Sequence, residues 1–141
     1  MAKTVLLTID LSNPEGNKAP LDAALELLRD GGVLHVVSVM PDFGFAQVSG
    51  YFRKGFEKEA LASFGATLKE WVNANVSDGV EARPHVLHGT IYDEILRAAD
   101  KLSVDVIVIG SHRPELKDYL LGPNAARVVR HARQSVYVVR T

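Results

Sequence analysis

Four short runs dominated by valine, isoleucine and leucine constrain the fold of this chain more than any other feature. They are Val5 to Ile9, Val33 to Met40, Val104 to Ile109 and Val136 to Val139. Apolar residues that follow one another with little polar alternation are typical of strands covered on both faces, as in parallel sheets. The four runs therefore predict strands of a parallel sheet that lies between layers of helices.

Segments with helical spacing separate these runs, because in each of them apolar residues recur every three or four positions. These segments are Leu21 to Leu28, Leu61 to Val72, Ile91 to Leu102 and Ala125 to Ala132. Asn17 and Pro20 stand where the first helix should begin, and Thr90 is a suitable N-cap for the third. Gly31-Gly32 and Gly79 follow the first and second helices. The alternation predicts one α/β doubly wound domain over residues 1–141.

A further strand is predicted from Val80 to Leu87, and it differs from the others. It alternates polar with apolar residues and contains Pro84, which cannot donate to a neighbouring strand, so it belongs at a sheet edge. Right-handed crossovers then give a five-stranded, Rossmann-like sheet with the order 3-2-1-4-5. Its winding direction reverses between the first and fourth strands. Ligands of open α/β sheets bind beyond the carboxyl ends of the strands at such a reversal, here Ile9-Asp10 and Ile109-Gly110.

The segment after the fourth strand has the form expected of a phosphate-binding loop. Gly110 ends the apolar run, a polar stretch follows, and Gly122 precedes the helical spacing that starts at Ala125. Glycines allow close backbone approach, and a helix start offers unpaired N–H groups to an anion. The same glycines also suit a plain strand end and helix start. Their coincidence with the cleft that the topology predicts favours a nucleotide or similar phosphorylated ligand.

Three polar side chains are candidates for contact with that ligand. Asp10 follows the first strand, where its carboxylate could accept from ribose hydroxyls or hold Mg²⁺, or could only shape the following loop. Arg113 and His112 could neutralise phosphate charge or be solvated loop residues. The sequence leaves these alternatives open. The histidines lack metal-ligand spacing, and no serine has the sequence context of an acyl-transfer nucleophile.

Composition excludes several classes of function. The 16 basic and 17 acidic side chains give a formal charge of -1, so nucleic acid is not an expected partner. The absence of cysteine removes disulfides, thiolate catalysis and cysteine-based zinc sites. No apolar run approaches the ~20 residues of a membrane span, and the first residues lack the features of a secretory signal. We expect a cytoplasmic protein without membrane contact.

The last predicted strand, Val136 to Val139, suggests a self-association surface. It contains no proline or charge, and the sequence ends shortly after it, so no following helix is available to cover it. Pairing with the same strand of a second subunit would satisfy its outer backbone groups and give a homodimer, with a tetramer as a further step. A short edge shielded by neighbouring side chains is the alternative.

In combination these segments resemble the universal stress protein family. The resemblance is carried by VLLTID, VLHVVSVM, HGTIYDEIL and the block VDVIVIGSHRPELKDYLLGPNAARVVRHARQSVYVVR. It covers nearly the whole chain except the loop Pro41 to Gly55 and the helix that follows it. The family fold is Rossmann-like, of the adenine nucleotide alpha hydrolase type.

The resemblance implies a set of ATP-binding residues, because ATP-binding members carry a G-x2-G-x9-G motif followed by Ser, Thr or Asn, and an aspartate after the first strand. Asp10 matches the aspartate near ribose and phosphates, with possible contact to Mg²⁺, and Val39 matches the position whose backbone meets the adenine. The implied nucleotide-binding set is Thr8, Ile9, Asp10, Val39, Ile109, Gly110, His112, Arg113, Gly122, Pro123 and Asn124.

Two positions depart from the family motif. Arg113 replaces the second glycine with a spacing to Gly122 one residue shorter than the motif, and its side chain could obstruct or contact a phosphate. Pro123 replaces the hydroxyl residue after Gly122, which removes a side-chain donor and an N–H, and Asn124 could supply a substitute donor.

The resemblance implies a homodimeric, ATP-binding stress-response module rather than an enzyme. One alternative is a slow ATPase, for which only Asp10 and His112 are candidate groups. Another is a family member that has lost nucleotide binding and acts through protein contacts. A response-regulator receiver is excluded, because the chain lacks the acidic pair after the first strand, the phosphoacceptor aspartate after the third and the lysine after the fifth.

Overall fold

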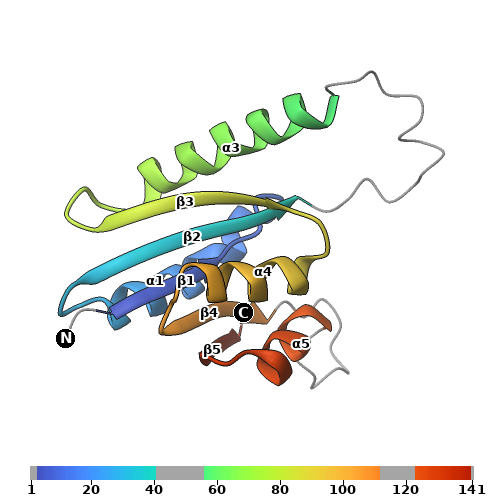
Figure 1. The fold of residues 1–141 in the computed structure, drawn as a ribbon. Helices are drawn as coiled ribbons and strands as arrows, with labels where there is room; N and C mark the ends of the chain where they lie inside the picture. The colour runs from blue at the N-terminus through green and yellow to red at the C-terminus, as the bar shows by residue number, and fades with distance from the viewer. Residues whose placement is uncertain (1–2, 41–55, 112–122, 141) are drawn as a thin grey trace.

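The computed structural model describes residues 3–40, 56–111 and 123–140, and it confirms the predicted α/β architecture (Figure 1). Five parallel strands form one sheet in the order β3-β2-β1-β4-β5, which is the predicted order. The strands are β1 (Lys3–Thr8), β2 (Gly32–Met40), β3 (Glu81–His88), β4 (Val106–Ser111) and β5 (Ser135–Arg140). The winding direction therefore reverses between β1 and β4, as the sequence predicts.

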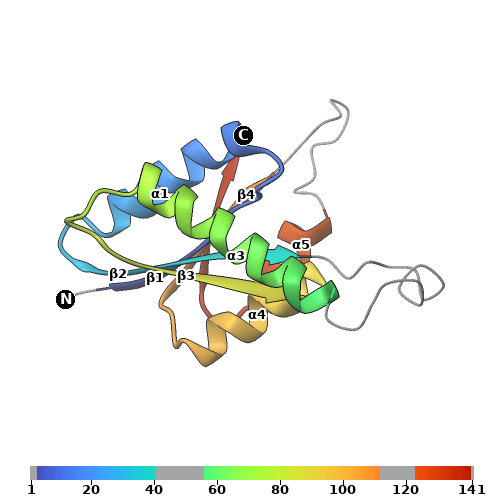
Figure 2. The same cartoon turned by 90° about the horizontal axis from the view of Figure 1, so that it is seen from above.

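Helices cover both faces of the sheet, as Figure 2 shows for α1 and α4. A 3-10 turn, η1 (Pro14–Asn17), leads into α1 (Lys18–Leu27), and the other helices are α3 (Phe56–Asn75), α4 (Ile91–Lys101) and α5 (Pro123–His131). No helix in the described ranges combines the length and apolar character needed to cross a bilayer.

The two faces of the sheet enclose two separate hydrophobic clusters. One joins α1 and α3 to Val5 and Leu7 of β1 and to Ile9 just after it, and the other joins α4 and α5 to Leu6 of β1 and Ile107 of β4. All these side chains are buried. The near-continuous apolar runs of the sequence reflect this burial on both sides, since alternate residues of a strand enter different clusters.

The edge strand β3 confirms the interpretation of Pro84. Among the described strands β3 pairs only with β2, and Pro84 lies opposite Val36. Glu81, Arg83 and Pro84 are exposed. A residue without an N–H is tolerated there because the outer side of an edge strand forms no ladder.

The turn between α1 and β2 needs glycine for two reasons. Gly31 and Gly32 have φ values of 102° and 135°, in the region that favours glycine. A Cβ atom at Gly32 would stand 2.0 Å from the backbone oxygen of Lys3, which is its partner in the β1–β2 pairing. The glycine pair therefore allows the amino ends of β1 and β2 to approach closely.

Candidate functional site

A cavity of about 750 Å³ opens at the carboxyl ends of the central strands, where the winding reverses. Its lining comes from the ends of β1, β2 and β4, the loop after β1, and parts of four helices. The lining residues are Thr8, Ile9, Asp10, Leu11, Ser12, Asn13, Gly16, Asn17, Pro20, Val37, Ser38, Val39, Phe64, Ile91, Ile95, Ile109, Gly110, Pro123, Asn124 and Ala125. The topology thus places a cavity of small-ligand size where the sequence predicts one.

Most of the predicted nucleotide-binding residues meet in this cavity. Those that line it are Thr8, Ile9, Asp10, Val39, Ile109, Gly110, Pro123 and Asn124. His112, Arg113 and Gly122 lie outside the described residues. Residues that are distant in sequence therefore converge on one cavity, because the parallel strands deliver their carboxyl ends to the same edge of the sheet.

Asp10 is exposed just beyond the carboxyl end of β1, and its carboxylate shapes the loop that follows. Its Oδ1 accepts hydrogen bonds from the backbone N–H of Ser12 (2.9 Å) and from the Ser12 hydroxyl (2.6 Å). This is the loop-shaping role that the sequence left as one of two alternatives. Because Asp10 also lines the cavity, the two roles are compatible.

Buried polar contacts hold the end of β1 against β2. The hydroxyl of Ser38 donates to the backbone oxygen of Ile9 at 2.9 Å, and the N–H of Ile9 donates to the carbonyl of Val37 at 3.0 Å. The Ser38 side chain is buried, so its bond forms away from competing water. The sequence pattern did not single out Ser38, which with His35 is one of two polar residues in the run Val33 to Met40.

Asn17 has a role that the helix-start interpretation missed. The prediction that α1 begins here is confirmed, since α1 starts at Lys18, but the Asn17 side chain makes no capping hydrogen bond. Its Oδ1 instead accepts from the backbone N–H of Asp10 (2.9 Å), and its Nδ2 donates to the backbone oxygen of Asp10 (2.8 Å). Thr90 likewise occupies the N-cap position of α4 without a side-chain capping bond.

The walls of the cavity are mainly apolar, and several come from residues that the sequence predicted only as helix core. Phe64 of α3, with Ile91 and Ile95 of α4, lies among them, facing a space that also borders Val37 and Val39 of β2. Apolar walls with a few polar groups suit a flat, partly hydrophobic ligand such as a nucleobase. Helical periodicity does not distinguish a cavity wall from core packing, so no sequence signal marks these residues.

The first turn of α5 borders the cavity opposite the β1 loop. Pro123 is the first residue of the helix and has no N–H, so the nearest unpaired backbone donors of this turn belong to Asn124 and Ala125. The N-terminus of a helix carries partial positive charge. This side of the cavity can therefore attract an anionic group, although the proline removes one donor.

A second polar cluster joins β2 to β3 away from the cavity lining. His35 Nδ1 and His85 Nε2 are 2.8 Å apart, with the ring centroids 5.0 Å apart. Burial, together with neighbouring His85 and Arg83, lowers the pKa of His35; burial and Arg83 lower the pKa of His85. In the described ranges no three His, Asp or Glu side chains gather as a metal site would require.

Comparisons with known proteins agree with this architecture. Residues 1–140 match the model of the universal stress protein family. The chain is 32% identical to universal stress protein G of Escherichia coli O157:H7, with 99% of this chain and 100% of that protein aligned. It is 30% identical to universal stress protein G of Salmonella typhimurium over the same shares.

Solved structures share the fold at lower identity. Hypothetical protein MJ0577 superposes with a TM-score of 0.81 at 22% identity, covering 100% of this chain and 97% of that one. Universal stress protein UspA from Lactobacillus plantarum gives 0.73 at 17% identity, with 98% and 97% covered. A universal stress protein in complex with cAMP gives 0.66 at 20% identity, with 99% and 98% covered. Given the family match over almost its whole length and the identity to universal stress protein G, this chain belongs to the universal stress protein family.

Proposed function

We propose that this protein binds ATP in the cavity at the carboxyl ends of β1 and β4, as a stress-response module rather than as an enzyme. The observation that carries the proposal is the convergence of eight residues from separate segments on one cavity of about 750 Å³, at the reversal of winding. A family relative of the same fold has been solved with cAMP, which is also an adenine nucleotide. That complex supports an adenine nucleotide as the ligand class.

The cavity offers a different chemistry to each part of the nucleotide. Its apolar wall, which includes Val39, Phe64 and Ile91, suits the base. The carboxylate of Asp10 can accept from a ribose hydroxyl. The first turn of α5 offers backbone N–H groups to phosphate oxygens, and Gly110, which has no side chain, allows a ligand to approach β4 closely.

Mg²⁺ fits this site only in company with the phosphates. Asp10 is the one acidic residue among the described residues that line the cavity. Mg²⁺ is commonly held by one or two carboxylates together with substrate phosphates, and it keeps several waters. Asp10 would be the protein's contribution, and the ion would neutralise phosphate charge beside it.

Binding is tested by titration calorimetry and by the thermal shift with MgATP. The wild-type protein should bind, with about 2.7 kcal/mol of stabilisation at a hundredfold excess over Kd. Asp10→Ala should weaken binding about tenfold or more, by the loss of a charged acceptor. Asp78→Ala removes another exposed carboxylate, outside the cavity, and should leave the affinity unchanged. No heat and no shift at millimolar MgATP would refute the proposal, and phosphate release above a buffer blank would reveal a slow ATPase instead.

We also propose that two copies pair through β5. Among the described strands β5 pairs only with β4, so its other edge is available to a second chain. Tyr137 in the middle of this strand is 45% exposed, which is unusual for a large apolar side chain in a sheet. Pairing of two β5 strands about a two-fold axis would satisfy backbone groups and cover Tyr137.

Native mass spectrometry tests the dimer with a matched pair of variants. Tyr137→Glu puts a charge on the proposed interface and should shift the protein towards monomer. Val129→Glu changes a residue of almost equal exposure, 44%, on α5 outside the strand and should leave the dimer intact. A wild-type monomer at micromolar concentration, or equal behaviour of the two variants, would argue against pairing through β5, whereas a mass of four chains would show a tetramer.

A further inference from the structure

The loop after β1 holds the backbone of Asp10 from both sides. The amide of Asn17, seven residues along the chain, bonds to the N–H and to the carbonyl oxygen of Asp10 at once. The N–H of Asn13 donates to the same carbonyl oxygen at 3.1 Å. The peptide groups on each side of the Asp10 Cα are thus fixed by partners within one loop.

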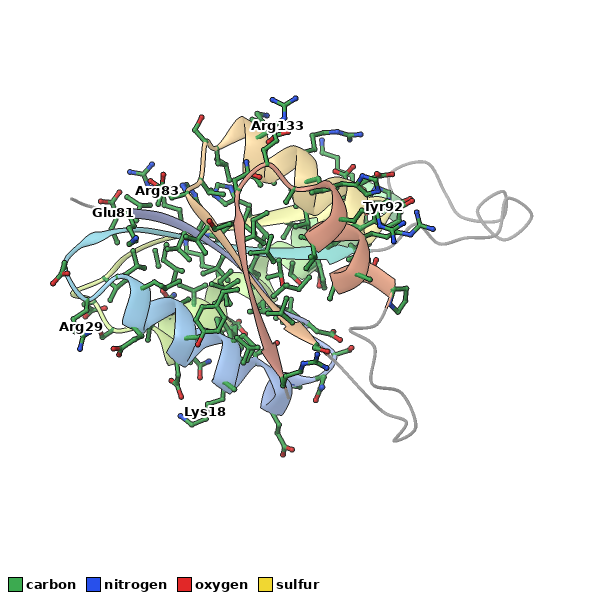
Figure 3. All side chains as sticks on the ribbon, turned by 90° about the horizontal axis from the view of Figure 1, so that it is seen from below. Lys18, Arg29, Glu81, Arg83, Tyr92 and Arg133 are labelled. Atoms are coloured by element: carbon green, nitrogen blue, oxygen red, sulfur yellow. The ribbon has the colours of Figure 1, made fainter. Side chains whose placement is uncertain are left out.

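Asn17 is buried, although the residues on either side of it in the sequence are not. It is 4% exposed, whereas Lys18 is exposed and its side chain points away from the protein (Figure 3). An asparagine that precedes a helix ordinarily caps it, and this one gives up that stabilisation. Because Oδ1 and Nδ2 of Asn17 both bond to the backbone of Asp10, this side chain stabilises the conformation at Asp10 and not the start of the helix.

The contacts that the described residues make with the Asp10 carboxylate engage only one of its two oxygens. Oδ1 accepts from the N–H and the hydroxyl of Ser12, which fixes the rotation of the carboxylate. None of the described residues donates to Oδ2. With the backbone held by Asn17 and Oδ1 held by Ser12, the position of Oδ2 is set before any ligand arrives, and Asp10 lines the cavity.

We propose that Asn17 is a positioning residue for nucleotide binding, and that it acts by holding Asp10 so that Oδ2 meets a hydroxyl donor of the ligand. The inference rests on the proposed function, because it assigns a task to Asn17 only if a nucleotide enters the cavity. Preorganisation of this kind raises affinity, since the free protein does not have to order the group on binding.

A double-mutant cycle on ATP affinity tests this inference. The proteins are the wild type, Asn17→Ala, Asp10→Ala and the double variant, titrated with MgATP by calorimetry. Asn17→Ala should weaken binding about tenfold when Asp10 is present. In the Asp10→Ala background the same change should weaken binding less than twofold, because the carboxylate that it positions is gone. A merely structural role would weaken binding equally in both backgrounds.

Control variants separate positioning from folding. Asn75→Ala removes another asparagine amide that donates to a backbone oxygen, that of Trp71 at 2.8 Å, outside the cavity, and should keep wild-type affinity. If Asn17→Ala does not fold by circular dichroism, Asn17→Ser, which retains a hydroxyl for one of the two bonds, takes its place in the cycle. Wild-type binding with unchanged affinity in the Asn17 variants would overturn the inference alone. Absence of wild-type binding would overturn the proposed function and the inference with it.

Discussion

The two polar clusters of the sheet, the Asp10–Asn17 loop and the His35–His85 pair, use buried polar groups in opposite ways. Asn17 and Ser38 bond to backbone groups at the end of β1, beside a cavity. His35 and His85 bond to each other across β2 and β3, and neither lines the cavity. In the first cluster Asn17 fixes the backbone of Asp10, and no described residue donates to Oδ2 of that residue. In the second cluster the two histidines bond to each other. Buried polar side chains can thus either fix a neighbouring backbone segment beside a cavity or only bond to each other.

The largest effect on stability is expected for the Asp10–Asn17 loop. Asn17→Ala leaves the partly buried N–H of Asp10 without its partner, whereas the carbonyl keeps its bond from Asn13. We expect a loss of about 1–3 kcal/mol in the free energy of unfolding, measured by urea denaturation. A loss below about 0.5 kcal/mol would mean that the loop rearranges and that the hydrogen bonds between Asn17 and Asp10 contribute little to stability.

Breaking the histidine pair should lower the stability of the protein without changing its affinity for MgATP. His85→Ala removes the partner of the buried His35 nitrogen, and we expect a loss of about 1–2 kcal/mol at pH 7.5. MgATP affinity should not change, because neither histidine lines the cavity. A clear change in affinity would show that the two clusters are coupled through β2, which contributes to both.

The smallest expected effect is a pH dependence confined to the histidine pair. The pKa of each histidine is lowered in the folded protein, so below the ordinary value of 6.5 the unfolded chain binds protons that the folded protein does not. The stabilisation is present above that pH and is lost as pH falls through the lowered pKa values. Urea unfolding from pH 7.5 to 5 should show a decline that is shallower in a His35→Leu, His85→Leu double variant.

Arg83 offers a sharper version of the same measurement. It lies beside Glu81 on the edge strand and forms an ion pair with it (Figure 3). Its guanidinium lowers the pKa of both histidines. Arg83→Gln should therefore bring the folded-state pKa of both histidines closer to the ordinary value and make the decline in stability smaller. It should have little effect at pH 7.5, because the residue is exposed. An unchanged decline would show that Arg83 contributes little to the lowered pKa values.

The sequence predicted the strands and their order because burial on both faces leaves a strong signal. Val5 to Ile9 and Val33 to Met40 are apolar almost without interruption, and Pro84 marks an edge strand, which with right-handed crossovers gives the observed order. The cavity followed from the same topology, since the ends of β1 and β4 had to meet beside the reversal. Features that depend on the path of the backbone were thus predictable from hydrophobic periodicity and from the positions of glycine and proline.

The rest of the site depends on side-chain partners that periodicity does not encode. Asn17 suits a helix cap and a backbone clamp equally well, and only the folded loop distinguishes them. Phe64 and Ile95 have the spacing of core residues whether they face packing or a cavity. The pairing of His35 with His85 needs the alignment of β2 with β3, which spacing within a single strand does not supply.

The close approach at Gly32 has a consequence for how β1 finds its place. A strand that is apolar on both faces gains almost the same burial if it slides along its neighbours, so hydrophobicity alone tolerates misalignment. At one end, the lack of a side chain at Gly32 leaves room for the backbone oxygen of Lys3. At the other end, Ser38 and Asn17 form hydrogen bonds with the backbone of Ile9 and Asp10. The alignment of β1 is thereby fixed at both ends, by the close approach at Gly32 and by the hydrogen bonds to Ile9 and Asp10.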